Sequence, residues 1–247
     1  LPPTVTISTT DGTAGESGAD QALSFTISRS GDTSAPLQVP LTASGTATAS
    51  DDYSGFQSSV TIPIGQTTAV LSLAVLSDNA AEGDETVTIR LGSSVAFLAG
   101  SPSSANATIA DRAAQAWFVQ NITDPTKRGP ADDADLDGVP NLAEYFMGSS
   151  PNGGAAPATP VQIDGGGNVT FIYPRALNRT GVTAVVEWST SLVQWFRSGQ
   201  TNGTHVLNIN ESTNSAPTDD PQIIKATVTS PTGTLPTPLF FRLNISE

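Results

Sequence analysis

Ala69-Val70-Leu71-Ser72-Leu73-Ala74-Val75 is an extended segment whose apolar face is formed by Leu71, Leu73 and Val75. Successive side chains of a β-strand point to opposite faces, so this period of two predicts a strand with one side in a core. Between residues 4 and 111 the pattern recurs in runs separated by Gly, Asp and Ser turns, at 5–7, 23–27, 37–41, 60–62, 86–91 and 107–110. Seven such strands predict an antiparallel two-sheet sandwich of immunoglobulin-like architecture.

Short apolar runs of the same kind return in the last third of the chain. They lie at 161–163, 169–173, 183–188, 195–196, 205–209, 223–228 and 239–245. The 247 residues are enough for two domains of ordinary size, each with its own core. The runs therefore predict a second sandwich.

The stretch between the two groups of strands reads Asp133-Ala134-Asp135-Leu136-Asp137-Gly138-Val139-Pro140-Asn141-Leu142-Ala143-Glu144. Acidic or amide side chains stand at positions 1, 3, 5, 9 and 12 with glycine at position 6, the spacing by which a loop surrounds a hard cation. Residues 141–147 have an apolar face and Gly148 stops them, which predicts the helix that follows such a loop. An ordinary Asp-rich turn is the alternative, but the combined pattern favours a Ca²⁺ site.

A second short helix is predicted at 113–120, which includes Trp117 and Phe118. The expected fold class is all-β, with two immunoglobulin-like β-sandwiches joined by a short helical calcium-loop connector. The expected domains are residues 1–111, a connector at 112–158 with its calcium loop at 133–144, and residues 159–247.

Composition limits the function classes. Acidic residues number 23 against 10 basic ones, and the net charge of -13 argues against nucleic acid or an anionic membrane as a partner. The chain has no cysteine and a single histidine, His205, so disulfides, thiolate sites and zinc are excluded as staples. No apolar run reaches the roughly 18 residues of a membrane span. The Thr- and Ser-rich composition is typical of secreted or cell-surface β-proteins, and we expect that a signal peptide or earlier domains precede Leu1.

The acidic residues of the first half stand at the ends of the predicted strands. They are Glu16, Asp52, Asp78, Glu82, Asp84, Glu85 and Asp111. If these strand ends meet at one pole, the carboxylates repel one another unless a cation neutralises them. The simpler alternative is that turns favour Asp and Glu for solubility. Periodicity alone leaves both interpretations open.

Several motifs of the first half occur together. They are Ser28-Arg29-Ser30-Gly31, Ser44-Gly45-Thr46-Ala47-Thr48 before Asp51-Asp52-Tyr53, Ile62-Pro63-Ile64-Gly65, Asp78-Asn79-Ala80-Ala81-Glu82-Gly83-Asp84-Glu85-Thr86-Val87, and Ala107-Thr108-Ile109-Ala110-Asp111. With them, residues 4–111 resemble a Calx-beta domain, a family that holds calcium at one pole of its sandwich. The resemblance implies a ligand role for Glu16, Asp52, Asp78, Glu82 and Asp111, with Glu85 as a weaker member.

The chain also departs from the Calx-beta pattern. Ser77 and Asn79 flank Asp78 where family members with a full calcium cluster carry further acids, and Arg112 follows Asp111. Since affinity follows ligand charge, we expect one or two ions at this pole.

Two looser resemblances concern the rest of the chain. The loop at 133–144 is similar to an isolated EF-hand-like or dockerin-like calcium loop, which implies ligation by Asp133, Asp135, Asp137 and Glu144, by the carbonyl of Val139, and by Asn141 directly or through water. A single loop of this kind fits a structural clasp better than a sensor that opens on binding. Residues 160–246 resemble a fibronectin-like module that closes large secreted bacterial proteins.

Enzyme function is not expected. His205 falls in a predicted strand, no Gly-x-Ser-x-Gly elbow is present, and each acidic cluster is explained better as a calcium site. We expect an extracellular, calcium-stabilised structural or adhesive module. Trp117, Trp188 and Trp195 keep a carbohydrate-binding accessory module open as the alternative, although tryptophan in a sandwich is more often core.

Self-association is a further expectation. Few charges discourage edge pairing, and an exposed sheet edge in one copy is expected to accept the strand after Leu1-Pro2-Pro3 from another, forming a filament or matrix. Partners other than calcium are expected among cell-surface proteins and glycans. A monomeric spacer in a longer protein is the alternative.

Overall fold

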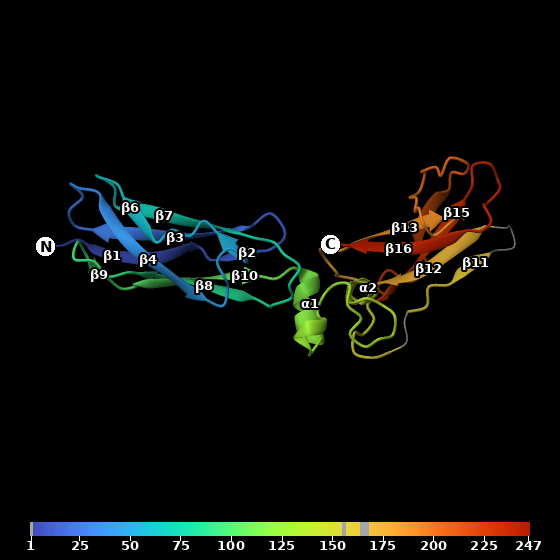
Figure 1. The fold of residues 1–247 in the computed structure, drawn as a ribbon, viewed down its shortest axis with the longest axis horizontal. Helices are drawn as coiled ribbons and strands as arrows, with labels where there is room; N and C mark the ends of the chain where they lie inside the picture. The colour runs from blue at the N-terminus through green and yellow to red at the C-terminus, as the bar shows by residue number, and fades with distance from the viewer. Residues whose placement is uncertain (1, 155–156, 164–167) are drawn as a thin grey trace. The chain divides into compact units, whose positions relative to one another are not determined.

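The computed structural model describes residues 2–154, 157–163 and 168–247 (Figure 1). The chain divides into a first unit, Leu1–Ala116, and a second unit, Trp117–Glu247. Each unit consists mainly of β-strands arranged in two sheets. The expected all-β class with two sandwiches is therefore confirmed, whereas the separate connector domain at 112–158 stays a prediction.

The first unit is a sandwich of two five-stranded sheets, in the strand orders β5-β7-β3-β1-β9 and β2-β10-β8-β4-β6 (Figure 1). Its strands are β1 (Thr4–Asp11), β2 (Thr13–Gly15), β3 (Ala22–Ser30), β4 (Leu37–Gly45), β5 (Tyr53–Ser54), β6 (Ser59–Ile62), β7 (Thr68–Val75), β8 (Glu85–Leu91), β9 (Leu98–Ala99) and β10 (Ser104–Ala110). All seven predicted strands are present. The three additional strands, β2, β5 and β9, are short and lie at sheet edges.

The core of the first unit follows from the period of two. Leu23 pairs with Leu73 and Phe25 with Leu71 across β3 and β7, and all four side chains are buried. Pairs of large apolar side chains on one face stabilise neighbouring strands. The segment that begins at Ala69 therefore contributes one face to the core of the first sandwich.

One end of this sandwich is closed by a buried arginine. Arg29, near the end of β3, donates to the carbonyl oxygens of Ala35, Pro63 and Gln66 at 2.8, 2.9 and 2.9 Å. Hydrogen bonds from a charged donor are among the stronger ones in proteins. They fix the loops after β3 and β6 to the end of β3.

The N-terminal strand is internal. β1 pairs with β3 along its length and with β9 at Thr4 and Val5. An exchange of β1 between copies would first have to break these pairings, so the structure gives no free N-terminal strand for the expected donation.

The second unit begins within a helix and continues through the loop to the strands (Figure 1). Its elements are α1 (Ala113–Asn121), η1 (Pro125–Lys127), α2 (Asn141–Met147), β11 (Val161–Ile163), β12 (Val169–Arg175), β13 (Thr183–Ser189), β14 (Asn208–Thr213), β15 (Gln222–Thr229) and β16 (Phe240–Ser246). The strands form a sheet in the order β11-β12-β15-β14 and a pair, β13-β16. Both predicted helices are present, and none of the helices in the described residues is long and apolar enough to span a bilayer.

Two strand predictions in this unit were wrong in detail. Phe196 forms only an isolated bridge with Trp188 in place of a strand at 195–196. The strand predicted from residue 205 begins at Asn208 because the Asn202 side chain accepts hydrogen bonds from the backbone N–H groups of Thr204 and His205. This Asx turn holds His205 outside the sheet.

Helix α2 is packed into the core of the second sandwich. Phe146 and Met147 are buried in the cluster that contains Phe171, Tyr173 and Val186. Gly148 ends the helix in the left-handed region, with φ 77°, and its N–H donates to the Glu144 carbonyl at 2.7 Å. The end of the predicted calcium loop is therefore held by the hydrophobic core.

Candidate metal centres

The predicted calcium ligands of the first unit come from four places in its fold. Glu16 follows β2, Asp52 precedes β5, the loop from β7 to β8 carries Asp78 and Glu82 and leads to Glu85, and Asp111 follows β10. The carboxylate oxygens of Asp52, Asp78 and Glu82 lie within 4.8 Å of one another. The structure therefore brings these three together at one end of the sandwich, which we call the acidic pole.

The remaining acids belong to the same pole. Glu16 is buried, and its pKa is raised to about 7 by burial and then by the charges of Asp111, Asp78 and Asp52. The pKa of Glu85 is also raised to about 7, first by burial and then by Asp52. Burial is likewise the main cause of the raised pKa of Glu82 and of Asp111. Each of these carboxylates is in an environment that opposes its negative charge.

Unpaired oxygens mark where a cation fits. Oε2 of Glu16 and Oε2 of Glu85 are buried and have no hydrogen-bond partner in the described part of the chain. A buried charged group without a partner is strongly unfavourable. The carboxylates that converge at the acidic pole offer oxygen atoms as metal ligands. A hard cation such as Ca²⁺ fits this donor set, since carboxylates are its usual ligands.

Backbone hydrogen bonds hold three of the acids in place. Asp52 accepts from the N–H of Thr48 at 2.5 Å, Asp78 from that of Ala80 at 2.7 Å, and Asp111 from that of Gly83 at 2.7 Å. The loops thus present these carboxylates in fixed orientations.

Sequence reasoning missed the contacts that tie the start of α1 to the pole. Gln115 is fully buried and donates to the carbonyl of Asp78 at 3.2 Å, and Arg112 donates to Oδ1 of Asn79 at 3.3 Å. The charge of Arg112 also lowers the pKa of Glu16, against the stronger effects that raise it. Two of the three departures from the family pattern, Asn79 and Arg112, therefore contact each other, and the arginine reduces the negative charge of the pole.

The second candidate centre is the loop at 133–144. Carboxylate oxygens of Asp133, Asp135 and Asp137 lie within 4.8 Å of one another. Asp133 accepts hydrogen bonds from the N–H groups of Leu136 at 2.7 Å and of Gly138 at 2.8 Å. Gly138 has φ 94°, a conformation that favours glycine, and this explains glycine at position 6. The loop is thus wrapped around its first aspartate.

The other loop positions are ordered by neighbouring residues. The N–H of Val139 donates to Asp137 at 2.9 Å, and that of Gly153 donates to Asp135. The Nδ2 group of Asn141 donates to the carbonyls of Lys127 and Gly129, both at 2.8 Å, while its buried Oδ1 has no partner among the described residues. The Nδ2 group is thus used in bonds to the protein, while Oδ1 is the atom that Asn141 can offer to a cation.

Glu144, at position 12, is the most deeply buried of these acids. It is 0% exposed, and neither carboxylate oxygen has a hydrogen-bond partner within the described ranges. Burial, then the charges of Asp135, Asp137 and Asp133, raise its pKa to about 8. A carboxylate in this position needs either a proton or a cation, and the three aspartates beside it favour the cation.

Residues 3–113 match the Calx-beta domain. The match spans the acidic pole, so the first unit is similar to a Calx-beta domain, while the rest of the chain lies outside the match. No curated protein matches the chain.

Three solved structures are similar to parts or most of the chain. The apo form of the Calx CBD1 domain is 24% identical, and the comparison covers 45% of this chain and 98% of that chain, with a TM-score of 0.39. The CBD12 structure of CALX1.2 is 24% identical over 44% of this chain and 45% of that chain, with a TM-score of 0.38. The calcium binding domain CBD12 of CALX1.1 is 15% identical over 98% of this chain and 80% of that chain, with a TM-score of 0.40.

Proposed function

We propose that the chain is an extracellular, calcium-stabilised structural module with two calcium centres. One is the acidic pole of the Calx-beta-like sandwich, with Glu16, Asp52, Asp78, Glu82, Glu85 and Asp111 as its ligand set. The other is the loop at 133–144, which we assign as an EF-hand-like or dockerin-like site ahead of a fibronectin-like module.

The observation that carries this proposal is the Glu144 carboxylate. It has no exposure and no hydrogen-bond partner among the described residues, yet it follows three converging aspartates on a helix whose next residues lie in the core. Calcium in the loop would satisfy Glu144 and would fix α2 to the loop. Because the native centre binds the ion and the unfolded chain does not, calcium would stabilise the folded protein.

Calorimetric titration of the metal-stripped protein with calcium tests the proposal. We expect at least two ions per chain, with one lost in Asp133→Asn and a different one lost in Asp78→Asn. Asp11→Asn is the matched control because Asp11 is exposed on β1. A titration that detects no calcium, or an EGTA-insensitive melting temperature, would overturn both centres.

We further propose an adhesive or self-associating role for this module. β11 is an edge strand that exposes Val161 (52%) and Ile163 (73%), and an exposed apolar edge favours pairing with another chain. This edge replaces the internal β1 as the candidate contact. Light scattering with calcium and then with EGTA tests it: concentration-dependent association that Ile163→Lys abolishes supports adhesion, whereas a monomer in both conditions leaves a spacer.

A further inference from the structure

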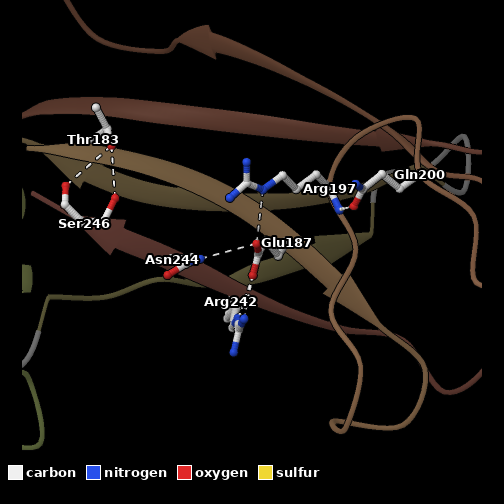
Figure 2. Close-up of polar contacts among 7 residues, drawn as sticks. All are labelled: Thr183, Glu187, Arg197, Gln200, Arg242, Asn244 and Ser246. Atoms are coloured by element: carbon white, nitrogen blue, oxygen red, sulfur yellow. Dashed lines mark hydrogen bonds and ion pairs between the residues drawn. The ribbon is translucent and has the colours of Figure 1, made fainter.

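A polar cluster covers the outer face of the β13–β16 pair, and Figure 2 shows its members. Val186 and Trp188 of β13 point into the core, so the alternate residues of this strand face outward. The strand register places three outward pairs in a row: Thr183 with Ser246, Val185 with Asn244, and Glu187 with Arg242. The face thus carries a strip of hydroxyl and amide groups that ends in charged side chains.

Two arginines share one buried carboxylate in this cluster. Glu187 is only 5% exposed. Its Oε2 accepts from Nη2 and Nε of Arg242 at 2.7 and 2.8 Å, and its Oε1 lies 3.4 Å from Nε of Arg197 (Figure 2). Burial alone would raise the pKa of Glu187, but the hydrogen bonds from Arg242 and Asn244 outweigh it and the pKa is lowered. Two guanidinium groups on one ionised carboxylate leave one positive charge in excess.

The arginines are held in place and still reach solvent. The guanidinium carbon of Arg242 lies 4.5 Å from the centroid of the Trp195 ring, a cation–π contact. The side chains of Arg197 and Arg242 are 59% and 46% exposed. Within the described ranges, no residue accepts a hydrogen bond from Nη1 of Arg242 or from either Nη atom of Arg197. Donors fixed in this way lose little entropy when they bind an anion.

Charge distribution makes this face accessible to an anion despite the net charge of -13. Residues 1–111 contain eleven acidic and two basic residues, whereas residues 159–247 contain six acidic and five basic ones. Residues 159–247 are therefore nearly neutral, and most of the excess negative charge lies in the rest of the chain.

We propose that Arg197 and Arg242 bind carboxylate or sulfate groups of an acidic polysaccharide. Guanidinium groups suit such anions because their N–H donors match the geometry of the oxygens. Asn244, Ser246 and Thr183 extend the site along the strands with groups that bind sugar hydroxyls. This strip favours a polyhydroxylated anion over an acidic peptide.

The three tryptophans do not form a shared sugar-stacking platform. Trp188 is fully buried, and Trp117 packs against Phe118, Tyr145 and Arg179. The Arg242 guanidinium lies over the ring of Trp195, so this face of the ring is already occupied. Recognition at this face therefore depends on the arginines.

Calorimetric titration with dextran sulfate and with polygalacturonate at low ionic strength in EGTA tests the site, with neutral dextran and poly-glutamate as comparisons. We expect both acidic polysaccharides to bind, and neutral dextran and poly-glutamate not to. Arg197→Gln and Arg242→Gln should each weaken binding roughly tenfold, as expected for the loss of a charge-assisted contact. Arg90→Gln, which removes the same charge from an exposed position on β8, should leave the affinity unchanged.

We expect both single variants to fold, because the other arginine still pairs with Glu187, although Arg242→Gln should cost more stability than Arg197→Gln since it removes the shorter contacts to a buried carboxylate. Circular dichroism confirms this, and Arg197→Lys should retain part of the affinity. Equal binding of poly-glutamate, absence of binding to both acidic polysaccharides, or equal losses in Arg90→Gln would overturn the proposal. Since the titrations are made without calcium, failure here leaves the calcium proposal intact.

Discussion

Replacing Glu144 with glutamine tests whether its buried carboxylate is a calcium ligand or only a buried acid. Its pKa is raised from 4.5 to about 8, so the folded metal-free protein holds this proton more tightly than the unfolded chain does. The stability that accompanies the proton is complete below pH 4.5 and is lost as the pH rises through 8. At about 1.4 kcal/mol for each pKa unit, the loss is at most roughly 5 kcal/mol.

Glutamine resembles the protonated side chain. In EGTA, Glu144→Gln should therefore exceed the wild type in free energy of unfolding by about 2 kcal/mol near pH 6, since the loss begins above pH 4.5, and by roughly 5 kcal/mol near pH 9, out of a total of about 5–15 kcal/mol for a typical domain. With calcium this advantage of the variant should shrink, because the variant lacks the closing carboxylate. Calcium at 100 times its Kd adds about 2.7 kcal/mol to the wild type, and the variant should gain much less.

Urea unfolding at both pH values, with calcium and with EGTA, measures these four differences, and Asp11→Asn is the control for a charge change at an exposed site. The reasoning fails if Glu144→Gln lowers stability in EGTA near pH 9, or if calcium stabilises the variant as much as the wild type. The first result would mean that the carboxylate is satisfied by protein groups, and the second that Glu144 does not contribute to calcium binding.

Three further predictions concern other residues. Because the pKa values of Glu16 and Glu85 are about 7 in the metal-free protein, calcium binding at the pole should weaken as the pH falls below 7 and should release protons, which titrations in buffers of different ionisation enthalpy measure. Asn141→Ala removes two hydrogen bonds that anchor the loop and should cost about 1–3 kcal/mol of stability even in EGTA, as seen by urea unfolding. Arg179→Leu removes a guanidinium that lies over two aromatic rings and should lower stability by about 1–2 kcal/mol, whereas exposed Arg90→Leu should change it by less than about 0.5 kcal/mol in the same assay.

The parts of the fold that follow from short-range patterns could be predicted from the sequence. Strand β3 alternates buried and partly buried residues along its length, and the loop at 133–144 has its ligand types at fixed spacing. Gly138 and Gly148 adopt the left-handed conformations that their positions require. In these places the physical cause lies within about a dozen residues.

Features that depend on distant residues could not be predicted. The period of two places Glu187 on an outer face, and only the return of β16 and of the Trp195 loop buries it. Gln115 is buried because it meets the Asp78 carbonyl, 37 residues away in the chain. Glu85 was expected to be a weaker member of the pole, yet it has a buried unpaired oxygen, since its depth is set by the packing of the two sheets.

Arg29 makes the two ends of the first sandwich chemically different. Its guanidinium closes the end of the sheet opposite the acidic pole with a cation that belongs to the chain and cannot dissociate. If calcium binds the acidic pole as proposed, the two ends of the same β3 strand should respond differently to the surroundings: the loops around Arg29 should keep their protection from proteases and from hydrogen exchange at any calcium concentration, while the loops around Asp78 should lose it when calcium falls. A drop in calcium would open this domain from one end only, and the first cleavage would fall between β7 and β8.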